Sequence, residues 1–388
     1  MDRVLSVSLG EIALKGLNRK YFEDQLIKQI RRAIKDLGIE KIYKEQGKIY
    51  IEGEVGNYPQ MVNRLKKVFG LVYISPCVRV EKDVEVISSA VIETVKEIKE
   101  NKNIKTFKVD TNRADKSFPI KSPDFSKKMG GIILQNFDDL KVDVHNPDIY
   151  LYIDIKQNVY IYTEKTKGYG GLPIGTNGKG LLLLSGGIDS PVAGFMMAKR
   201  GIELSCVHYH SYPFTSERAE EKVKELAHIL ARYTGKLKIF SVNLLDIQKE
   251  INSKCPEDEM TILSRRFMMR IAEKIANYHQ INALITGENL GQVASQTIHG
   301  LNVTNQSVNL PVFRPLIGFD KVDIIKIAKD IETYETSIMP FDDCCTVFLP
   351  KHPVTRPKVE DIIKSEEALD VDTLIDNAIT NMKVYTIE

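Results

Sequence analysis

One stretch decides the fold of the second half of this chain: Leu181-Leu182-Leu183-Leu184-Ser185-Gly186-Gly187-Ile188-Asp189-Ser190. A run of four leucines, typical of a buried strand, is followed directly by a glycine turn and then by a helix-forming segment at 193–198. Strand, tight turn and helix in this order present consecutive backbone N–H groups beside the positive end of a helix dipole. Such a nest binds an anion with several charges, so the stretch predicts a phosphate-binding loop.

The side chains of the loop indicate which anion it binds. Gly186 and Gly187 let the backbone approach a ligand closely, because they carry no Cβ. Ser185 and Ser190 add hydroxyl groups. Asp189 would repel phosphates unless a divalent cation lay between them. The loop therefore predicts a nucleotide pyrophosphate bound together with Mg²⁺.

The loop differs from the commoner phosphate-binding motif, because Gly178 and Lys179 precede the strand instead of following it. The run Ser-Gly-Gly-x-Asp-Ser resembles instead the pyrophosphate loop of the ATP pyrophosphatase superfamily. That resemblance implies cleavage of ATP between its α and β phosphates, with AMP left on a substrate. The alternative is a glycine turn that only joins a strand to a helix.

Composition limits the class of protein. A chain of 388 residues, 43% apolar and 27% charged, is typical of a globular protein with two or three domains. No apolar run reaches the length of a membrane span, and the first residues lack the pattern of an export signal. We therefore expect a cytoplasmic protein without membrane contact.

The five cysteines have no framework spacing and form no Cys-x-x-Cys, so a disulfide scaffold is not expected. Cys344 and Cys345 are adjacent in a loop between Pro340 and Pro350, a poor place to bury a thiol. This position favours a reactive or sulfur-carrying thiol over an inert buried cysteine. An iron–sulfur cluster built from scattered cysteines is the less favoured interpretation.

Charge is distributed unevenly. Residues 1–175 carry 30 Lys and Arg against 24 Asp and Glu, whereas the rest of the chain has an acidic excess. Basic residues of the middle segment are interleaved with Phe107, Phe118 and Phe125, which suits nucleic acid. RNA contacts are expected at Lys108, Arg113 and Lys116. The alternative is a basic solvated surface above a normal core that buries the phenylalanines.

Periodicity divides the chain into four parts. A small α/β domain is expected at 1–60, a second domain at 61–165, a glycine-rich linker at 166–180 and a third domain at 181–388. In the third domain strands are expected at 181–184, 204–209, 237–242 and 283–286, and helices at 190–200, 216–233, 261–279 and 320–331. This alternation predicts a parallel sheet with helices on both faces.

Several polar residues fall where these strands end, which is where such sheets bind ligands. His208 and Tyr209 end the second strand, beside the phosphate loop. Gly287 follows the fourth strand and opens a segment rich in amides and hydroxyls. Arg265 and Lys321 lie near these strand ends along the chain and are expected to meet phosphate. Without the context of the loop, each of these two cations is more typical of a protein surface.

In this order the motifs resemble the tRNA 4-thiouridine sulfurtransferase family (ThiI type) over essentially the whole chain. The matching segments are 10–16 (Gly-Glu-Ile-Ala-Leu-Lys-Gly), 169–175 (Tyr-Gly-Gly-Leu-Pro-Ile-Gly), the loop at 185–190, the segment 286–297 and the cysteine pair. The resemblance implies an α/β multi-domain protein. Its parts would be an N-terminal ferredoxin-like α+β domain, a THUMP RNA-binding domain and a C-terminal parallel-sheet PP-loop ATP pyrophosphatase domain.

The resemblance also implies the chemistry: the uridine at position 8 of tRNA is adenylated on the oxygen at ring position four, and a persulfide sulfur then displaces AMP. Besides the loop residues Ser185, Gly186, Gly187 and Ser190, the implied ATP contacts are Leu183, Leu184, His208, Tyr209, Arg265, Gly287 and Gln296. The catalytic residues would be Asp189, which also takes the Mg²⁺ of ATP, Lys321 and a sulfur-bearing thiol, with Cys345 preferred over Cys344.

The implied partners are tRNA, a cysteine desulfurase, a second copy in a homodimer and, for thiamine synthesis, a sulfur-carrier protein. Some family members hold the persulfide on a C-terminal rhodanese domain, for which the segment after Cys345 leaves no room, so a separate desulfurase is expected to supply sulfur. Two alternatives are another adenylating enzyme acting on a different base or small molecule, and an RNA-binding protein with an inactive nucleotide fold. Asp189 and Lys321 argue against the second.

Overall fold

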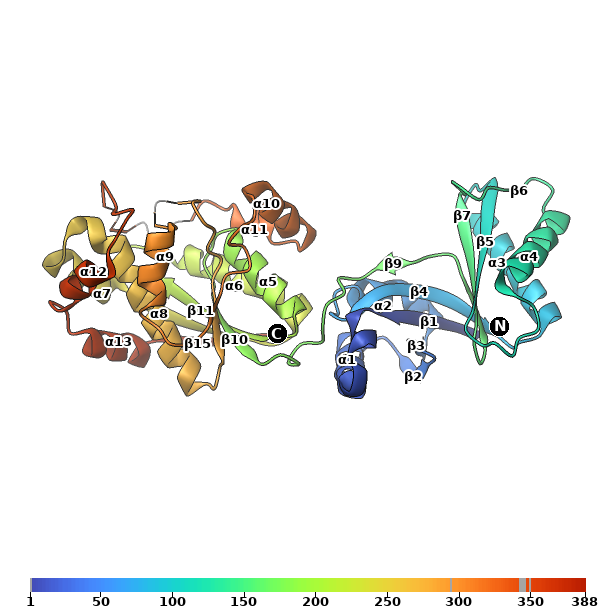
Figure 1. Cartoon of the computed structure of the whole chain (residues 1–388), viewed down its shortest axis with the longest axis horizontal. Helices are drawn as coiled ribbons and strands as arrows, with labels where there is room; N and C mark the ends of the chain where they lie inside the picture. Colours follow the sequence, from blue (N-terminus) through green and yellow to red (C-terminus); the bar gives the residue numbers. More distant parts are fainter. Residues whose placement is uncertain (1, 294, 342–346, 349) are drawn as a thin grey trace. The chain divides into compact units, whose positions relative to one another are not determined.

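The computed structural model describes residues 2–293, 295–341, 347–348 and 350–388. It divides into two compact units, Met1–Pro173 and Ile174–Glu388, each with its own sheet and its own hydrophobic core (Figure 1). None of the helices in these ranges is both long and apolar enough to cross a bilayer.

The first unit is built on one continuous mixed sheet. Its strands are β1 (Asp2–Leu9), β2 (Ile39–Glu45), β3 (Lys48–Gly53), β4 (Leu71–Val80), β5 (Thr106–Arg113), β6 (Lys141–Val142), β7 (Ile149–Ile155), β8 (Val159–Tyr162) and β9 (Thr166–Lys167). Its helices are α1 (Arg19–Ala33), α2 (Tyr58–Leu65), α3 (Val84–Asn101) and α4 (Ser122–Asn136). The strand order is β2-β3-β1-β4-β8-β7-β5-β6, with β9 paired to β4.

Strand β4 joins the two halves of this sheet. It pairs with β1 along 71–79 and with β8 along 78–80, both antiparallel. One core lies under α1 and α2, and a separate core lies under α3 and α4.

Periodicity alone did not predict β4, because Pro76 interrupts its pattern and prolines are disfavoured inside strands. The residue-60 boundary falls inside α2, whose Met61 and Leu65 pack in the first core.

The second unit is an α/β sheet of six strands. The strands are β10 (Lys179–Leu183), β11 (Glu203–His210), β12 (Leu237–Asn243), β13 (Ala283–Ile285), β14 (Val312–Phe313) and β15 (Lys383–Ile387). The helices are α5 (Asp189–Lys199), α6 (Glu217–Thr234), α7 (Leu245–Lys254), α8 (Met260–Tyr278), α9 (Ile298–Asn305), α10 (Lys321–Asp330), α11 (Tyr334–Ser337), α12 (Val359–Glu366) and α13 (Val371–Thr380). The strand order is β14-β13-β10-β11-β12-β15, parallel except for β15.

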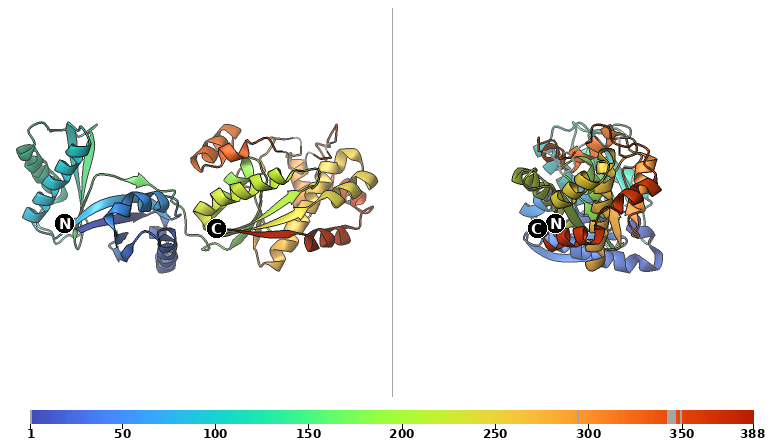
Figure 2. Two further views of the ribbon diagram at one scale, coloured as in Figure 1. Left: turned by 180° about the vertical axis from the view of Figure 1, so that it is seen from behind. Right: turned by 90° about the vertical axis from the view of Figure 1, so that its left-hand side faces the viewer.

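Helices cover both faces of this sheet, as the alternation of strands and helices predicted (Figures 1 and 2). Helices α5, α6, α10 and α11 pack together on one face, and α7, α8, α9 and α13 pack on the other. The eight elements expected in this unit agree with the structure to within one or two residues. The elements not predicted, which lack a long periodic pattern, are the helices α7, α9, α11, α12 and α13 and the edge strands β14 and β15.

Candidate active site

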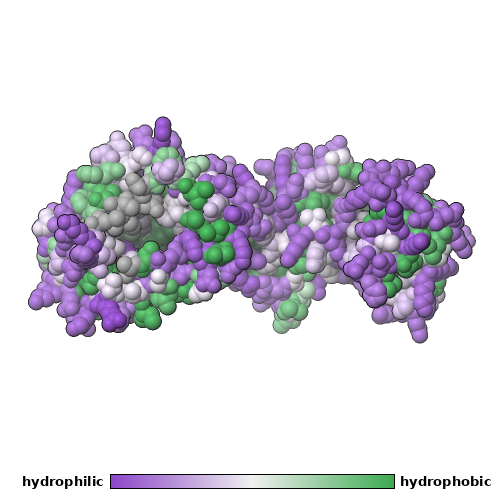
Figure 3. Space-filling view, turned by 90° about the horizontal axis from the view of Figure 1, so that it is seen from above, coloured by the Kyte–Doolittle hydropathy of each residue, from purple (hydrophilic) through white to green (hydrophobic). Residues whose placement is uncertain are grey.

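A cavity of about 410 Å³ opens where β10, β11 and β13 end. Figure 3 views the molecule from above and shows apolar side chains around a recess in this unit. The cavity is lined by Asp189 and by every residue expected to contact ATP except Gly186. Its volume suits a nucleoside-sized ligand. Residues spread from Leu183 to Thr304 thus meet at one edge of the sheet, as the parallel topology requires.

The glycine loop at the end of β10 is closed by its own serines. The Ser190 hydroxyl accepts a hydrogen bond from the backbone N–H of Ser185 at 3.0 Å, and the Ser185 hydroxyl accepts one from the N–H of Gly187 at 3.3 Å. Hydroxyl groups therefore satisfy two of the donors that the sequence argument assigned to an anion. These two hydrogen bonds within the loop fix its backbone conformation without a ligand.

Gly287 sits where β13 approaches this loop. A Cβ at this position would lie 2.7 Å from the backbone nitrogen of Ser190. Any side chain there would push β13 away from the first turn of α5. The glycine is therefore required for a close approach of two backbone segments of the protein, whereas the sequence suggested a close approach to ligand.

Lys321 contacts Asp189, which lines the cavity, although 132 positions separate the two residues. The Lys321 ammonium lies 2.5 Å from one carboxylate oxygen of Asp189, and the side-chain amide of Gln292 donates to the other at 2.7 Å. The charge of Asp189, which the sequence argument balanced with Mg²⁺, is balanced here by a lysine. Gln292 was not predicted, and nothing in the sequence distinguishes it from the neighbouring amides.

Two carboxylates line the cavity, and one of them, Glu288, is already ion-paired with two arginines, which leaves Asp189 for a magnesium ion. Among the described residues no group of three or more His, Cys, Asp or Glu side chains could hold a metal. Asp189 lines the cavity with 19% of its side chain exposed. This fits a cation that brings its other oxygen ligands from water and nucleotide phosphates, as Mg²⁺ does, and does not fit a metal held by protein alone.

His208 forms part of the cavity wall in a neutral state. Its Nδ1 lies 3.1 Å from the carbonyl oxygen of Leu184, so Nδ1 carries the proton and donates it. Burial lowers the pKa of His208 to about 4. The hydroxyl of neighbouring Tyr209 donates to the carbonyl of Met268 on α8. Both residues therefore connect β11 to other parts of the wall.

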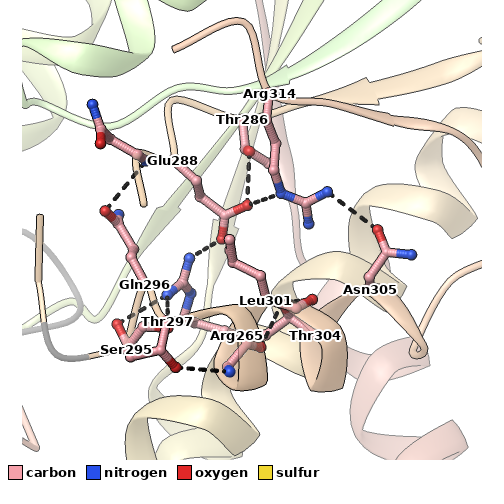
Figure 4. Close-up of polar contacts among 12 residues, drawn as sticks. Arg265, Thr286, Glu288, Ser295, Gln296, Thr297, Leu301, Thr304, Asn305 and Arg314 are labelled. Carbon is pink, nitrogen blue, oxygen red and sulfur yellow. Dashed lines mark hydrogen bonds and ion pairs between the residues drawn. The ribbon is translucent and has the colours of Figure 1, made fainter. Parts of the chain in front are cut away.

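A carboxylate held by two arginines stands behind the loop (Figure 4). Glu288 is 7% exposed and forms ion pairs with Arg265 of α8 and with Arg314, which follows β14. Burial alone would raise the pKa of Glu288, but the two guanidinium groups outweigh it and hold this pKa below its usual value. Neither Glu288 nor Arg314 was selected from the sequence, although both follow strands.

Gln296 stabilises the segment that follows Glu288. Its side-chain oxygen accepts from the backbone N–H of Asn289 at 3.3 Å, and its carbonyl accepts from that of Gly291 at 2.8 Å. The segment therefore folds back on itself beside the cavity. Cys344 and Cys345 lie outside the described residues.

The three cations expected to contact RNA lie on the first unit, in β5 and the turn after it. Each donates to a backbone carbonyl: Lys108 to Val144 at 3.2 Å, Arg113 to Phe118 at 2.7 Å and Lys116 to Arg113 at 3.2 Å. Lys116 is exposed and the other two are half-buried. The phenylalanines interleaved with them are all buried in the core, which confirms the more conservative interpretation for these rings.

The fold and the cavity define a class: a PP-loop-type nucleotide-binding domain that follows a separate sheet-based unit in the chain. Three family models match the chain: Thiamine biosynthesis protein (ThiI) over 175–371, ThiI ferredoxin-like domain over 4–75 and THUMP domain over 81–164. The chain belongs to the ThiI family of tRNA sulfurtransferases. This confirms the resemblance and the order of domain types predicted from the motifs.

Relatives match the chain over its whole length. It is 58% identical to a probable tRNA sulfurtransferase of Alkaliphilus metalliredigens and 54% identical to one of Finegoldia magna, in each case over 100% of this chain and 99% of the relative. A crystal structure of a 4-thiouridine synthetase–RNA complex with bound ATP matches with a TM-score of 0.92 and 41% identity, covering 100% of both chains.

Proposed function

We propose that this protein is an ATP-dependent tRNA sulfurtransferase that converts the uridine at position 8 of tRNA to 4-thiouridine. The observation that carries the proposal is the cavity at the carboxyl ends of β10, β11 and β13, which the glycine loop and Asp189 line and where Lys321 pairs with Asp189. The names of the full-length relatives, and of the ATP-bound synthetase with the same fold, support it.

In the first step, the uridine oxygen at ring position four attacks the α-phosphorus of ATP. The bond from that phosphorus to the bridging oxygen breaks, pyrophosphate leaves, and the base loses its ring N–H proton. The first turn of α5 and the Lys321 ammonium stabilise the charge that grows on pyrophosphate. Asp189 would hold a magnesium ion, which supplies further charge neutralisation when bound. Lys321 must release Asp189 in part to reach the phosphates.

In the second step, the outer sulfur of a protein persulfide attacks the activated carbon and AMP leaves. The product is at first joined to the protein through a sulfur–sulfur bond, which a second thiol breaks to free 4-thiouridine. The disulfide left behind is reduced by an external thiol, so electrons balance over the cycle. Cys345 is proposed to carry the persulfide because its position fits the family's cysteine best, with Cys344 as the second candidate. A thiolate is the form that accepts sulfur.

The remaining assignments belong to the same proposal. Leu183, Leu184, His208, Tyr209, Arg265, Gly287 and Gln296 surround ATP, together with Ser185, Gly186, Gly187 and Ser190. Lys108, Arg113 and Lys116 contact tRNA from the first unit. A cysteine desulfurase supplies the sulfur, the enzyme works as a homodimer in the cytoplasm, and Mg²⁺ accompanies ATP.

Pyrophosphate release tests the first step directly. Purified protein, ATP, Mg²⁺ and unmodified tRNA should release pyrophosphate, whereas tRNA that already carries 4-thiouridine should release little. Equal release with both tRNAs would indicate a different target base, and no release would indicate an inactive nucleotide fold. Mass spectrometry of tRNA from a deletion strain should show loss of 4-thiouridine.

A second role is favoured by the name of the matching family model, Thiamine biosynthesis protein. We propose that the same persulfide also supplies sulfur, through a sulfur-carrier protein, for the thiazole of thiamine. A deletion strain should then require thiazole or thiamine for growth. Normal growth without either compound would limit the protein to tRNA.

A further inference from the structure

Glu288 uses both of its carboxylate oxygens to join three elements at the back of the cavity (Figure 4). One oxygen accepts from Nη2 of Arg265 on α8. The other accepts from Nε of Arg314 at 2.7 Å and from the hydroxyl of Thr286 at 2.9 Å. Removal of this carboxylate would therefore take the charged partner from two guanidinium groups at once.

The two arginines differ in what they face. Arg265 lines the cavity together with Glu288, whereas Arg314 does not. Arg265 is also held from the other side, since its Nη1 donates to the Ser295 hydroxyl at 2.9 Å. A planar guanidinium held at two of its nitrogens has little freedom to turn. Arg314 reaches Asn305 at 3.2 Å, behind the cavity.

We propose that Glu288 is a positioning residue: it fixes the Arg265 guanidinium in the orientation that binds ATP, and Arg314 holds Glu288 in place. This inference rests on the proposed function, because it takes ATP as the ligand of the cavity. Glu288 acts on ATP through Arg265, which is the residue that touches the nucleotide.

A role as general base fits this carboxylate poorly. Adenylation of uridine releases a proton, and a base that accepts it needs a free lone pair and a pKa near the working pH. Burial would raise the pKa of Glu288, but Arg265 and Arg314 hold it low, and both oxygens already accept hydrogen bonds. The two roles make different predictions: loss of a base lowers kcat, whereas loss of a positioning residue weakens ATP binding.

The decisive variant is Glu288→Gln. The amide can accept from one arginine with its oxygen, but its NH₂ group then faces the N–H groups of the other, so one guanidinium must move. We expect the Kd for ATP, measured by titration calorimetry without tRNA, to rise at least about tenfold. The KM for ATP should rise in parallel, while kcat at saturating substrates should change by less than about threefold.

The chain offers a matched control. Glu366 is also a buried carboxylate between two arginines, Arg266 and Arg270, but none of the three lines the cavity. Glu366→Gln should weaken the fold without changing the Kd for ATP in the folded protein. An equal loss of ATP affinity in both variants would show a general effect of unfolding and would overturn the proposal.

A double variant tests whether changes at Glu288 and Arg314 offset or add to one another in their effect on the Kd for ATP. Arg314→Met removes the competing guanidinium, so the amide oxygen in Glu288→Gln/Arg314→Met is free to accept from Arg265. We expect the double variant to bind ATP more tightly than Glu288→Gln alone. A purely structural role for Glu288 predicts the opposite, because two losses of packing add.

If Glu288→Gln does not fold, Glu288→Asp takes its place. Aspartate keeps the charge but is one methylene shorter, so it cannot reach both arginines, and the Kd for ATP should rise at least about threefold. An unchanged Kd in a folded variant overturns the positioning role while leaving the proposed function intact. Failure of the wild-type protein to bind ATP would overturn the proposed function itself.

Discussion

Two buried clusters in the second unit have the same composition and different surroundings. Glu288 lies between Arg265 and Arg314, and Glu366 of α12 lies between Arg266 and Arg270 of α8. Glu366 accepts two hydrogen bonds from each arginine, at 2.7 to 2.8 Å. In both clusters the arginines outweigh the effect of burial and keep the pKa of the carboxyl group below its usual value.

The difference arises within one helix turn. Arg265 and Arg266 are consecutive in α8, and consecutive residues of an α-helix point about 100° apart. Arg265 therefore reaches the cavity wall, while Arg266 reaches α12. A buried ion pair therefore has no function of its own: its position decides whether it lines a cavity or joins two helices.

The largest effect is expected at the carboxylate that the cavity exposes, Asp189. In Asp189→Asn the partner of Lys321 and the proposed magnesium ligand is lost, so pyrophosphate release should fall about a thousandfold. The matched control is Asp320→Asn, because Asp320 is an exposed carboxylate beside Lys321 whose side chain makes no capping hydrogen bond. Similar rates in the two variants would remove Asp189 from the mechanism.

The next largest effect is expected on stability, at Glu366. Glu366→Gln leaves Arg266 and Arg270 without a charged partner in a buried site, which should lower the free energy of unfolding by about 3 kcal/mol. Urea unfolding of the full chain measures this change. Tm should fall in parallel, and a stability equal to that of the wild type would show that the α8–α12 contact does not need the charge.

His208 provides the opposite case, a buried group whose charge burial suppresses. With its pKa lowered to about 4 in the folded protein, the unfolded chain binds a proton below about pH 6.5 that the folded protein does not bind. The contribution of neutral His208 to the free energy of unfolding is fully present above about pH 6.5. It is lost as pH falls towards 4. The loss should be about 2 kcal/mol at pH 5.

The variant His208→Asn checks this assignment, since asparagine keeps a donor for the Leu184 carbonyl but does not titrate. Urea unfolding at pH 7 and pH 5 should show a smaller difference for the variant than for the wild type. An identical difference in the two proteins would mean that another group causes the pH dependence.

The smallest effect is expected in the first unit, where cations lie on an exposed surface. Lys116 is exposed, and its ammonium donates to the Arg113 carbonyl. Lys116→Ala should weaken tRNA binding about threefold and reduce the salt dependence of binding by about one ion. Filter binding at several salt concentrations measures both. Lys236→Ala, an exposed lysine of the second unit, is the control that should change neither.

Short-range sequence patterns were sufficient to predict the elements that form from a run of apolar residues and an adjoining glycine turn. The four leucines and the glycine turn predicted β10, the loop and α5, because burial and turn geometry act within a few residues. Strand β4 escaped prediction because Pro76 lies inside it, and its pairing with β1 and β8 depends on partners far along the chain. The same reason explains the missed edge strand β15, which pairs only with β12.

The residues of the candidate site also divide into those that the sequence predicted and those that only the structure revealed. Asp189 was selected from the sequence by the loop motif, Arg265 by its place and the family resemblance, and Lys321 by its place at the start of a helix. Glu288 and Arg314 were not, since an acidic residue and a basic residue 26 positions apart form no pattern. Only the fold shows that β13 and β14 are neighbours in the sheet and end beside α8.

The amino-acid sequence by itself predicted the parallel sheet and the glycine loop, because these depend on short-range spacing of apolar residues, glycines and hydroxyls. The resemblance of its motifs gave the family and the order of the domain types. The tertiary structure decided which charges meet. It paired Asp189 with Lys321 and Gln292, gave Glu288 two arginines, and left Glu366 away from the cavity. Electrostatic partners are set by distance in space, and the chain order alone does not contain that distance.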